Sequence, residues 1–172
     1  RPSLYRVQAR ALFEAVADRR AAGGHPLVEV MIPLTVSGPE LAEARCWVEE
    51  AAVEAALGEA PVVGTMIETP RAALVAGTLA PHADFFSIGS NDLTQMTFGF
   101  SRDDVEVRFL GDYVGRGLLD HNPFDRLDDL AVGELVDLAV ERGRTAVPGL
   151  KVGVCGEHAG EPASIRRLLA AG

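Results

Sequence analysis

Lysine is almost absent from this sequence: Lys151 is the only one, and 16 basic residues face 25 acidic residues. The formal net charge is -9 and the sequence pI is near 4.9. Nucleic acids are bound through clustered Lys and Arg side chains, so this balance argues against a nucleic-acid partner. No apolar run approaches the roughly 18 residues of a membrane-spanning helix, and no basic-then-apolar leader opens the chain. We therefore expect no membrane partner and a cytoplasmic location.

Cysteine is rare as well. Cys46 and Cys155 lie far apart and resemble neither a disulfide framework nor a metal-binding knuckle, which indicates a reducing compartment. Of the 172 residues, 48% are hydrophobic, which is enough to bury the core of one domain. The chain starts at Arg1 and not at a methionine, so we expect it to be a piece of a longer protein.

Short apolar runs alternate with segments that open on helix-start residues. The runs predict strands at residues 27–34, 62–67, 84–88 and 151–155. Ser37-Gly-Pro-Glu40, Thr69-Pro70 and Glu161-Pro162 are typical helix starts. With the apolar periodicity they predict helices at residues 3–22, 37–57, 69–79, 91–97, 129–144 and from 161 onward. Residues 99–117 carry charges and glycines without clear periodicity, which predicts a long loop, and such loops are usually functional.

Alternating strands and helices indicate an α/β fold with right-handed crossovers, and two architectures compete. An open sheet of the dinucleotide-binding type needs a glycine-rich turn after its first strand, and Pro-Leu-Thr-Val-Ser-Gly at residues 33–38 does not fit. A (β/α)8 barrel needs about 250 residues, so this chain could supply roughly half of one. We predict a partial (β/α)8 TIM barrel of about four β/α units.

Two predicted strands each end in a carboxylate. Glu68 follows the strand at 62–67, and Asp92 follows the strand at 84–88. Neighbouring strands lie about 4.8 Å apart, so the two side chains could share one hard cation such as Mg2+, which takes one or two protein carboxylates. In the alternative, Glu68 pairs with Arg71 and Asp92 only caps the helix that follows. Spacing alone gives the two interpretations about equal weight.

Other candidate groups stand at the same predicted strand ends. Gly89-Ser90-Asn91 is a strand-to-helix turn that could offer donors to an anion, although most such turns only reverse the chain. Cys155 ends the last strand beside Gly156-Glu157-His158, where a thiol could act as an acid or nucleophile; an inert buried cysteine is the alternative. Arg102, in the predicted loop, is either a surface charge or a contact for an anionic ligand.

Three strings carry a resemblance to a known family. They are Gly64-Thr-Met-Ile-Glu-Thr-Pro-Arg-Ala-Ala73, the run from Phe85 to Asp104 with Gly-Ser-Asn-Asp-Leu-Thr-Gln at its centre, and Lys151-Val-Gly-Val-Cys-Gly-Glu-His158. Together they resemble the phosphoenolpyruvate-utilising enzymes, from about residue 10 to Gly172. A synthase and a phosphotransferase-system enzyme of this family share the central string. Residues 96–104 and 156–158 favour instead the member that interconverts ATP, phosphate and pyruvate with AMP, diphosphate and phosphoenolpyruvate.

The resemblance implies a barrel that binds phosphoenolpyruvate or pyruvate, with residues 1–172 as the C-terminal portion of that single domain. By motif match, Glu68 and Asp92 would be the Mg2+ ligands, and Cys155 would protonate the enolate of pyruvate. The residues that would contact substrate are Glu68, Gly89, Ser90, Asn91, Asp92 and Arg102. Ser90 stands where the family usually has threonine and keeps the hydroxyl. Arg102 matches an arginine that contacts substrate in the phosphotransferase-system relative.

The same resemblance implies partners outside this chain. The family's phosphohistidine and nucleotide-binding domains belong to the full-length enzyme, and no stretch here resembles either. Early barrel strands and the last strand are also missing, so we expect the isolated chain to be catalytically inactive. Open sheet edges invite pairing, which favours a homodimer. A non-catalytic binding module that keeps the fold stays open as the alternative.

Overall fold

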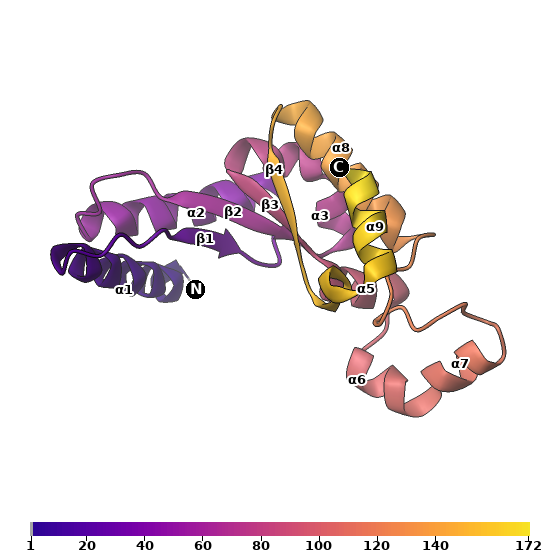
Figure 1. The fold of residues 1–172 in the computed structure, drawn as a ribbon. Coiled ribbons are helices and arrows are strands. Elements are labelled where there is room, and N and C mark those ends of the chain that lie inside the picture. The colour runs from indigo at the N-terminus through magenta and orange to yellow at the C-terminus, as the bar shows by residue number, and fades with distance from the viewer. Residues whose placement is uncertain (1) are drawn as a thin grey trace.

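The computed structural model describes residues 2–172, in which strands and helices alternate along most of the chain (Figure 1). The strands are β1 (Glu29–Ile32), β2 (Val62–Ile67), β3 (Phe85–Gly89) and β4 (Lys151–Cys155). The α-helices are α1 (Pro2–Ala21), α2 (Gly38–Glu54), α3 (Pro70–Leu74), α4 (Ala76–Leu79), α5 (Ser90–Phe98), α6 (Arg102–Val105), α7 (Gly111–Gly115), α8 (Val132–Ala146) and α9 (Pro162–Ala171). Shorter turns are η1 (Ala80–His82), the π-helical η2 (Glu106–Leu110) and η3 (Glu157–Gly160).

The four strands form one parallel sheet in the order β1-β2-β3-β4. Ile67 of β2 lies opposite Ile88 of β3, and Gly89 of β3 lies opposite Cys155 of β4. The carboxyl ends of the last three strands therefore meet at one edge of the sheet. The predicted α/β class is confirmed, and the parallel sheet is consistent with part of a barrel.

Side-chain caps begin three of the helices at the predicted positions. Thr69 accepts a hydrogen bond from the backbone N–H of Ala72 at 3.0 Å, and Pro70 occupies the first turn of α3. Ser37 caps α2 in the same way, and the carboxylate of Glu161 accepts from two backbone N–H groups at the start of α9. These caps satisfy donors that a helix leaves free at its N-terminus, so the local sequence fixes where the chain turns from strand to helix.

Helices cover one face of the sheet and leave the other open. On the covered face, strand residues such as Ile67, Phe86 and Ile88 join α3, α4 and α8 in the main core. A second core, centred on Phe13 and Val63, holds α1 and α2 together. Strand residues that point the other way line an open groove, among them Met31, Phe85, Ser87, Lys151 and Gly153. Parallel sheets are rarely left bare on one face, so this groove is where further structure would fit.

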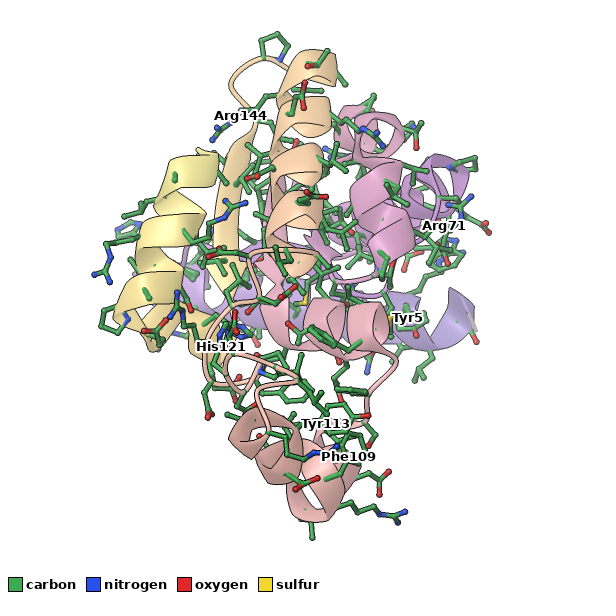
Figure 2. All side chains as sticks on the ribbon, turned by 90° about the vertical axis from the view of Figure 1, so that its right-hand side faces the viewer. Tyr5, Arg71, Phe109, Tyr113, His121 and Arg144 are labelled. Carbon is green, nitrogen blue, oxygen red and sulfur yellow. The ribbon has the colours of Figure 1, made fainter. Side chains whose placement is uncertain are left out.

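The prediction of a loop over residues 99–117 is wrong. Most of this segment is helical, because α6, η2 and α7 follow one another from Arg102 to Gly115, and Figure 1 shows them projecting away from the sheet. Val105 and Leu110 pack on Phe124 in a small core of their own. Phe109 and Tyr113, labelled in Figure 2, have ring centroids 4.9 Å apart. We call residues 102–115 the helical lobe; its core is too small to impose a clear apolar stripe on the sequence.

Smaller departures concern element ends. The first strand is shorter than residues 27–34, because Leu27 is exposed and Leu34 has φ = 53°, outside the extended region. The helix predicted at residues 69–79 is divided at Val75, whose φ of -109° and ψ of 17° interrupt it. Across residues 2–172, no helix has both the length and the hydropathy needed to cross a membrane.

Candidate functional site

The sequence-predicted acids and thiol lie at the same edge of the sheet. Glu68 directly follows β2, Asp92 lies in the first turn of α5 after β3, and Cys155 is the last residue of β4. Three separate strands bring them there, and because the strands are parallel, their carboxyl ends point the same way. The structure thus brings Glu68, Asp92 and Cys155 together as the sequence predicted.

Glu68 is buried, with 3% of its surface exposed. Its Oε1 accepts a hydrogen bond from the backbone N–H of Leu34 at 2.6 Å. Burial raises the pKa of the Glu68 carboxyl; the Leu34 amide opposes this rise, and the nearby Asp92 carboxylate adds to it. A buried carboxylate beside a second one is costly for the fold unless a cation or a proton is present.

Two backbone features hold Glu68 in place. Leu34 has φ = 53°, a left-handed conformation that is uncommon for a leucine, and it directs its N–H at the carboxylate. Gly89, on the adjacent strand, leaves no room for a side chain, since an added Cβ would lie 2.7 Å from Cβ of Glu68 and 2.7 Å from Sδ of Met66. Neither feature was predicted, and for Leu34 the residue type gives no signal at all.

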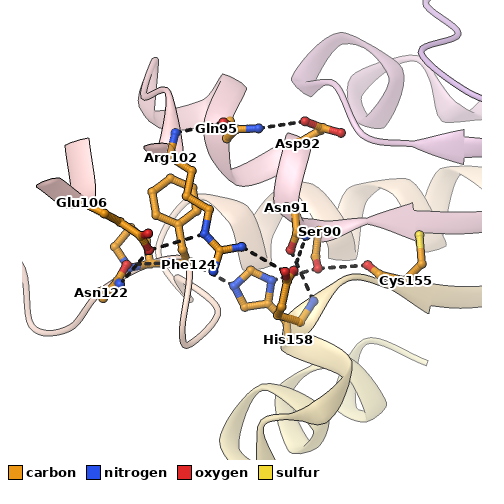
Figure 3. A network of polar contacts seen from close by, with 12 residues as sticks. Ser90, Asn91, Asp92, Gln95, Arg102, Glu106, Asn122, Phe124, Cys155 and His158 are labelled. Atoms are coloured by element: carbon orange, nitrogen blue, oxygen red, sulfur yellow. Dashed lines mark hydrogen bonds and ion pairs between the residues drawn. The ribbon is translucent and has the colours of Figure 1, made fainter. Parts of the chain in front are cut away.

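Asp92 is held by the residue one turn later. Its Oδ1 accepts from Nε2 of Gln95 at 2.8 Å, while Oε1 of Gln95 accepts from the backbone N–H of Arg102 at 3.0 Å (Figure 3). The side chain of Gln95 therefore connects Asp92 to the start of the helical lobe. Gln95 belongs to the Asn-Asp-Leu-Thr-Gln string, but nothing in that string indicates that its side chain would hold Asp92.

The structural alternatives to a shared cation do not hold. Arg71 donates a hydrogen bond to the backbone carbonyl of Val36, and the described residues contain no ion pair between Arg71 and Glu68. Asp92 does not cap α5, because Gly89 stands at the N-cap and no side chain caps that helix. Both carboxylates are therefore oriented by other contacts.

The donor set at this edge suits a hard cation. Among residues 2–172, no group of three or more His, Cys, Asp and Glu side chains could by itself hold a metal ion. Glu68 and Asp92 are two carboxylates, and Mg2+ is commonly bound by one or two carboxylates with water and substrate oxygens in its other positions. These residues fit Mg2+ in chemistry, and their assignment as its ligands stays a prediction.

Cys155 is partly exposed, and its sulfur has polar neighbours. The Ser87 hydroxyl donates to Sγ at 3.3 Å, and Sγ lies 3.5 Å from the carbonyl oxygen of Ile88 and 3.9 Å from Sδ of Met66. Cys155 is therefore not fully buried, and its role as a proton donor stays a prediction.

His158 does not assist the thiol. It is completely buried, and its ring nitrogens lie 2.8 Å from Oγ of Ser90 and 2.9 Å from the carbonyl oxygen of Pro123. Ser90 is also fully buried, and its hydroxyl donates to the backbone carbonyl of Cys155 at 3.1 Å. The Ser90 side chain therefore ties the start of α5 to the end of β4, so any contact of Ser90 with substrate would come from its backbone.

A polar cluster lies next to the Ser90–Cys155 hydrogen bond and consists of Asn91, Arg102 and Glu157. Nη1 of Arg102 lies 3.0 Å from Oε1 of Glu157, and the Asn91 side-chain amide donates to the other Glu157 oxygen. The Glu157 backbone amide, then Asn91 and Arg102, lower the pKa of the Glu157 carboxyl. Phe124 lies under the guanidinium, with Cζ of Arg102 5.7 Å from the ring centroid. Glu157 belongs to the sequence string around Cys155, but its contact with Arg102 could not be predicted because the two residues are 55 positions apart.

The fold and this edge define an α/β protein with an acidic, oxygen-rich site at the ends of parallel strands. The profile of the family described as PEP-utilising enzyme, PEP-binding domain, matches residues 1–172. The chain therefore belongs to the phosphoenolpyruvate-utilising enzymes, and the family resemblance in its sequence is confirmed.

Several relatives are similar over nearly the whole chain. Pyruvate, phosphate dikinase 2 of Zea mays is 51% identical over 168 residues, which cover 95% of this chain and 19% of that protein. Pyruvate, phosphate dikinase of Rhizobium meliloti (strain 1021) is 50% identical over 171 residues, which cover 96% of this chain and 19% of that protein. The chloroplastic pyruvate, phosphate dikinase 1 of Oryza sativa subsp. japonica is 51% identical over 175 residues, which cover 99% of this chain and 18% of that protein. The chain spans about a fifth of the length of these relatives.

Proposed function

We propose that this chain is the phosphoenolpyruvate- and pyruvate-binding part of a pyruvate, phosphate dikinase. In the complete enzyme, a phosphohistidine on another domain would exchange its phosphoryl group with pyruvate bound here, and a nucleotide-binding domain would supply or accept phosphate. The single observation that carries this proposal is the convergence of Glu68, Asp92 and Cys155 at three neighbouring strand ends.

Glu68 and Asp92 are the residues that would hold Mg2+. When bound, the ion would stabilise the negative charge on the oxygens of phosphoenolpyruvate and of the enolate of pyruvate. The protein prepares this position by burying Glu68 and directing its carboxylate with the Leu34 amide. Burial disfavours the charged form of Glu68 and so raises its pKa, and the same low-dielectric surroundings strengthen the attraction between the ionised carboxylate and a cation.

Cys155 is the residue that would move the proton. As phosphoryl transfer from phosphoenolpyruvate leaves an enolate, the thiol S–H bond breaks and a new C–H bond forms at the methylene carbon, which yields pyruvate and a thiolate. In the reverse direction the thiolate takes a proton from the pyruvate methyl group. Ser87, whose hydroxyl donates to Sγ at 3.3 Å, would stabilise the thiolate left behind.

The remaining predicted contacts would hold the anionic groups of the substrate. Asn91 and Arg102 present an amide and a guanidinium on the same side of the site, as Figure 3 shows. Gly89 and Ser90 would contribute backbone N–H groups at the start of α5.

We further propose that residues 1–172 are the C-terminal portion of one (β/α)8 barrel domain. The open groove on the sheet, lined by Met31, Phe85 and Lys151 among others, supports this proposal because closing a barrel would cover it. The two free sheet edges also favour a homodimer. A cytoplasmic location stays a prediction, because the names of some relatives place those proteins in the chloroplast. The isolated chain would bind ligand without turnover.

Ligand binding and proton exchange test the proposal. We expect oxalate to bind in the presence of Mg2+, as measured by calorimetry, and Asp92→Asn to abolish that binding. In the full-length protein, Cys155→Ala should stop exchange of the pyruvate methyl protons with deuterated water while leaving Mg2+ binding intact. Cys46→Ala is the matched control, because Cys46 is exposed on α2 far along the chain. Unchanged exchange in Cys155→Ala would remove Cys155 from the mechanism.

A further inference from the structure

The carboxylate of Glu157 occupies the donors that the proposed function assigns to substrate. Its Oε1 lies 3.0 Å from Nη1 of Arg102, and its Oε2 accepts from the side-chain amide of Asn91. The backbone N–H of Glu157 also donates to Oδ1 of Asn91, at 3.4 Å. Arg102 and Asn91, both labelled in Figure 3, thus already bind one carboxylate, which the protein itself supplies.

Arg102 does not depend on Glu157 for its position. Its Nε lies 3.4 Å from Oε1 of Glu106, and its guanidinium rests on the ring of Phe124 at 5.7 Å. The side chain of Glu157, in contrast, is 55% exposed, compared with 29% for Arg102. Glu157 can therefore move into water while Arg102 stays where it is.

We propose that Glu157 is a built-in competitor of the anionic substrate. Its carboxylate leaves Arg102 and Asn91 when a carboxylate or phosphate group of the substrate takes the same donors, so Glu157 limits the affinity of the site. The inference rests on the proposed function, because it takes Asn91 and Arg102 as substrate contacts. Gly156 makes the arrangement possible: its φ is 110°, and a Cβ there would lie 2.6 Å from Oγ of Ser90.

Oxalate, a dianion of two carboxylates, is the probe, titrated by calorimetry into the full chain with Mg2+ present. Glu157→Gln keeps the size of the side chain and removes its charge, and Glu157→Ala removes the competing oxygens. We expect both variants to bind oxalate roughly two- to fivefold more tightly, the range that one exposed ion pair contributes. Glu141→Gln, on the exposed side of α8, makes the same change in net charge and should leave the affinity unchanged.

Each result decides between the two proposals. If the wild type binds oxalate and Glu157→Gln binds it equally or more weakly, the competitor role is wrong while the proposed function stands. If neither the wild type nor the Glu157 variants bind oxalate, the proposed function fails and the competitor role fails with it. If Glu157→Ala does not fold, as judged by circular dichroism, the nearly isosteric Glu157→Gln decides the question alone.

Discussion

Replacing Gly89 with alanine is the sharpest perturbation of the site. Gly89 has φ = -81° and ψ = 75°. Because any L-residue can adopt this φ, an alanine at position 89 would not strain the backbone, and its effect would come from its Cβ alone. The added Cβ would lie 2.7 Å from Cβ of Glu68 and from Sδ of Met66, where carbon contacts normally begin near 3.5 Å. Met66 can turn aside, but Glu68 must shift by nearly an ångström. The substitution therefore moves the proposed metal ligand directly.

Overpacking of this kind costs about 1–3 kcal/mol of unfolding free energy. We expect Gly89→Ala to lose that amount in urea unfolding, and to bind Mg2+ roughly 10- to 100-fold more weakly in calorimetry, as substitutions that disturb the support of metal ligands usually do. Gly153→Ala is the control, because Gly153 lies on the next strand with no atom within 4 Å of its added Cβ. It should be neutral or stabilising by up to about 1 kcal/mol. Equal stability and equal Mg2+ affinity in the two variants would refute the reasoning.

Two further predictions concern the acid and the thiol. Without Mg2+, Glu68→Gln should be more stable than the wild type at pH 7.5. Burial raises the pKa of Glu68 in the folded state, so the free energy of unfolding of the wild type falls as the pH rises through that raised pKa, and the difference between the two proteins should vanish below the ordinary carboxyl range. Urea unfolding in EDTA measures this difference, and a less stable variant at pH 7.5 would contradict the prediction. In a Cys46→Ala background, Ser87→Ala should slow alkylation of Cys155 by iodoacetamide about fivefold. This is the effect expected from the loss of one hydrogen bond of about 1 kcal/mol between the Ser87 hydroxyl and the Cys155 sulfur. An unchanged alkylation rate would show that Ser87 does not stabilise the Cys155 thiolate.

The parts of this structure that the sequence predicts are those controlled by neighbouring residues. Strands β2 and β4 have the predicted bounds. For β2 the reason is that a strand buried in a parallel sheet forms a nearly continuous apolar run, whereas β4 is largely exposed and is delimited by Gly149 before it and Gly156 after it. Thr69 and Glu161 begin their helices as expected, since each cap bonds to an amide two or three residues away. Once the sheet is parallel and β3 lies between β2 and β4, the placement of Glu68 and Cys155 at the same edge of the sheet follows from topology alone.

Features that depend on distant contacts could not be predicted in this way. The helical lobe from Arg102 to Gly115 has only a small core of its own, so its sequence lacks a clear amphipathic period. The orientation of His158 depends on Ser90 and on the carbonyl of Pro123, 68 and 35 positions away. Glu157 meets its partner across a comparable separation, and nothing in either local sequence identifies the pair.

The costs that the fold accepts around Glu68 support the proposed role of this carboxylate over a purely structural one. Leu34 adopts a left-handed φ to direct an amide at it, Gly89 gives up a side chain beside it, and Asp92 adds a like charge. A fold optimised for stability alone would gain from relaxing the Leu34 backbone or the carboxylate pair, since a left-handed leucine and a buried carboxylate beside a second one each cost free energy. Three separate elements contribute these costs, and all three act on the same carboxylate. The cation that we propose between Glu68 and Asp92 would offset both the burial of the Glu68 charge and its repulsion by Asp92.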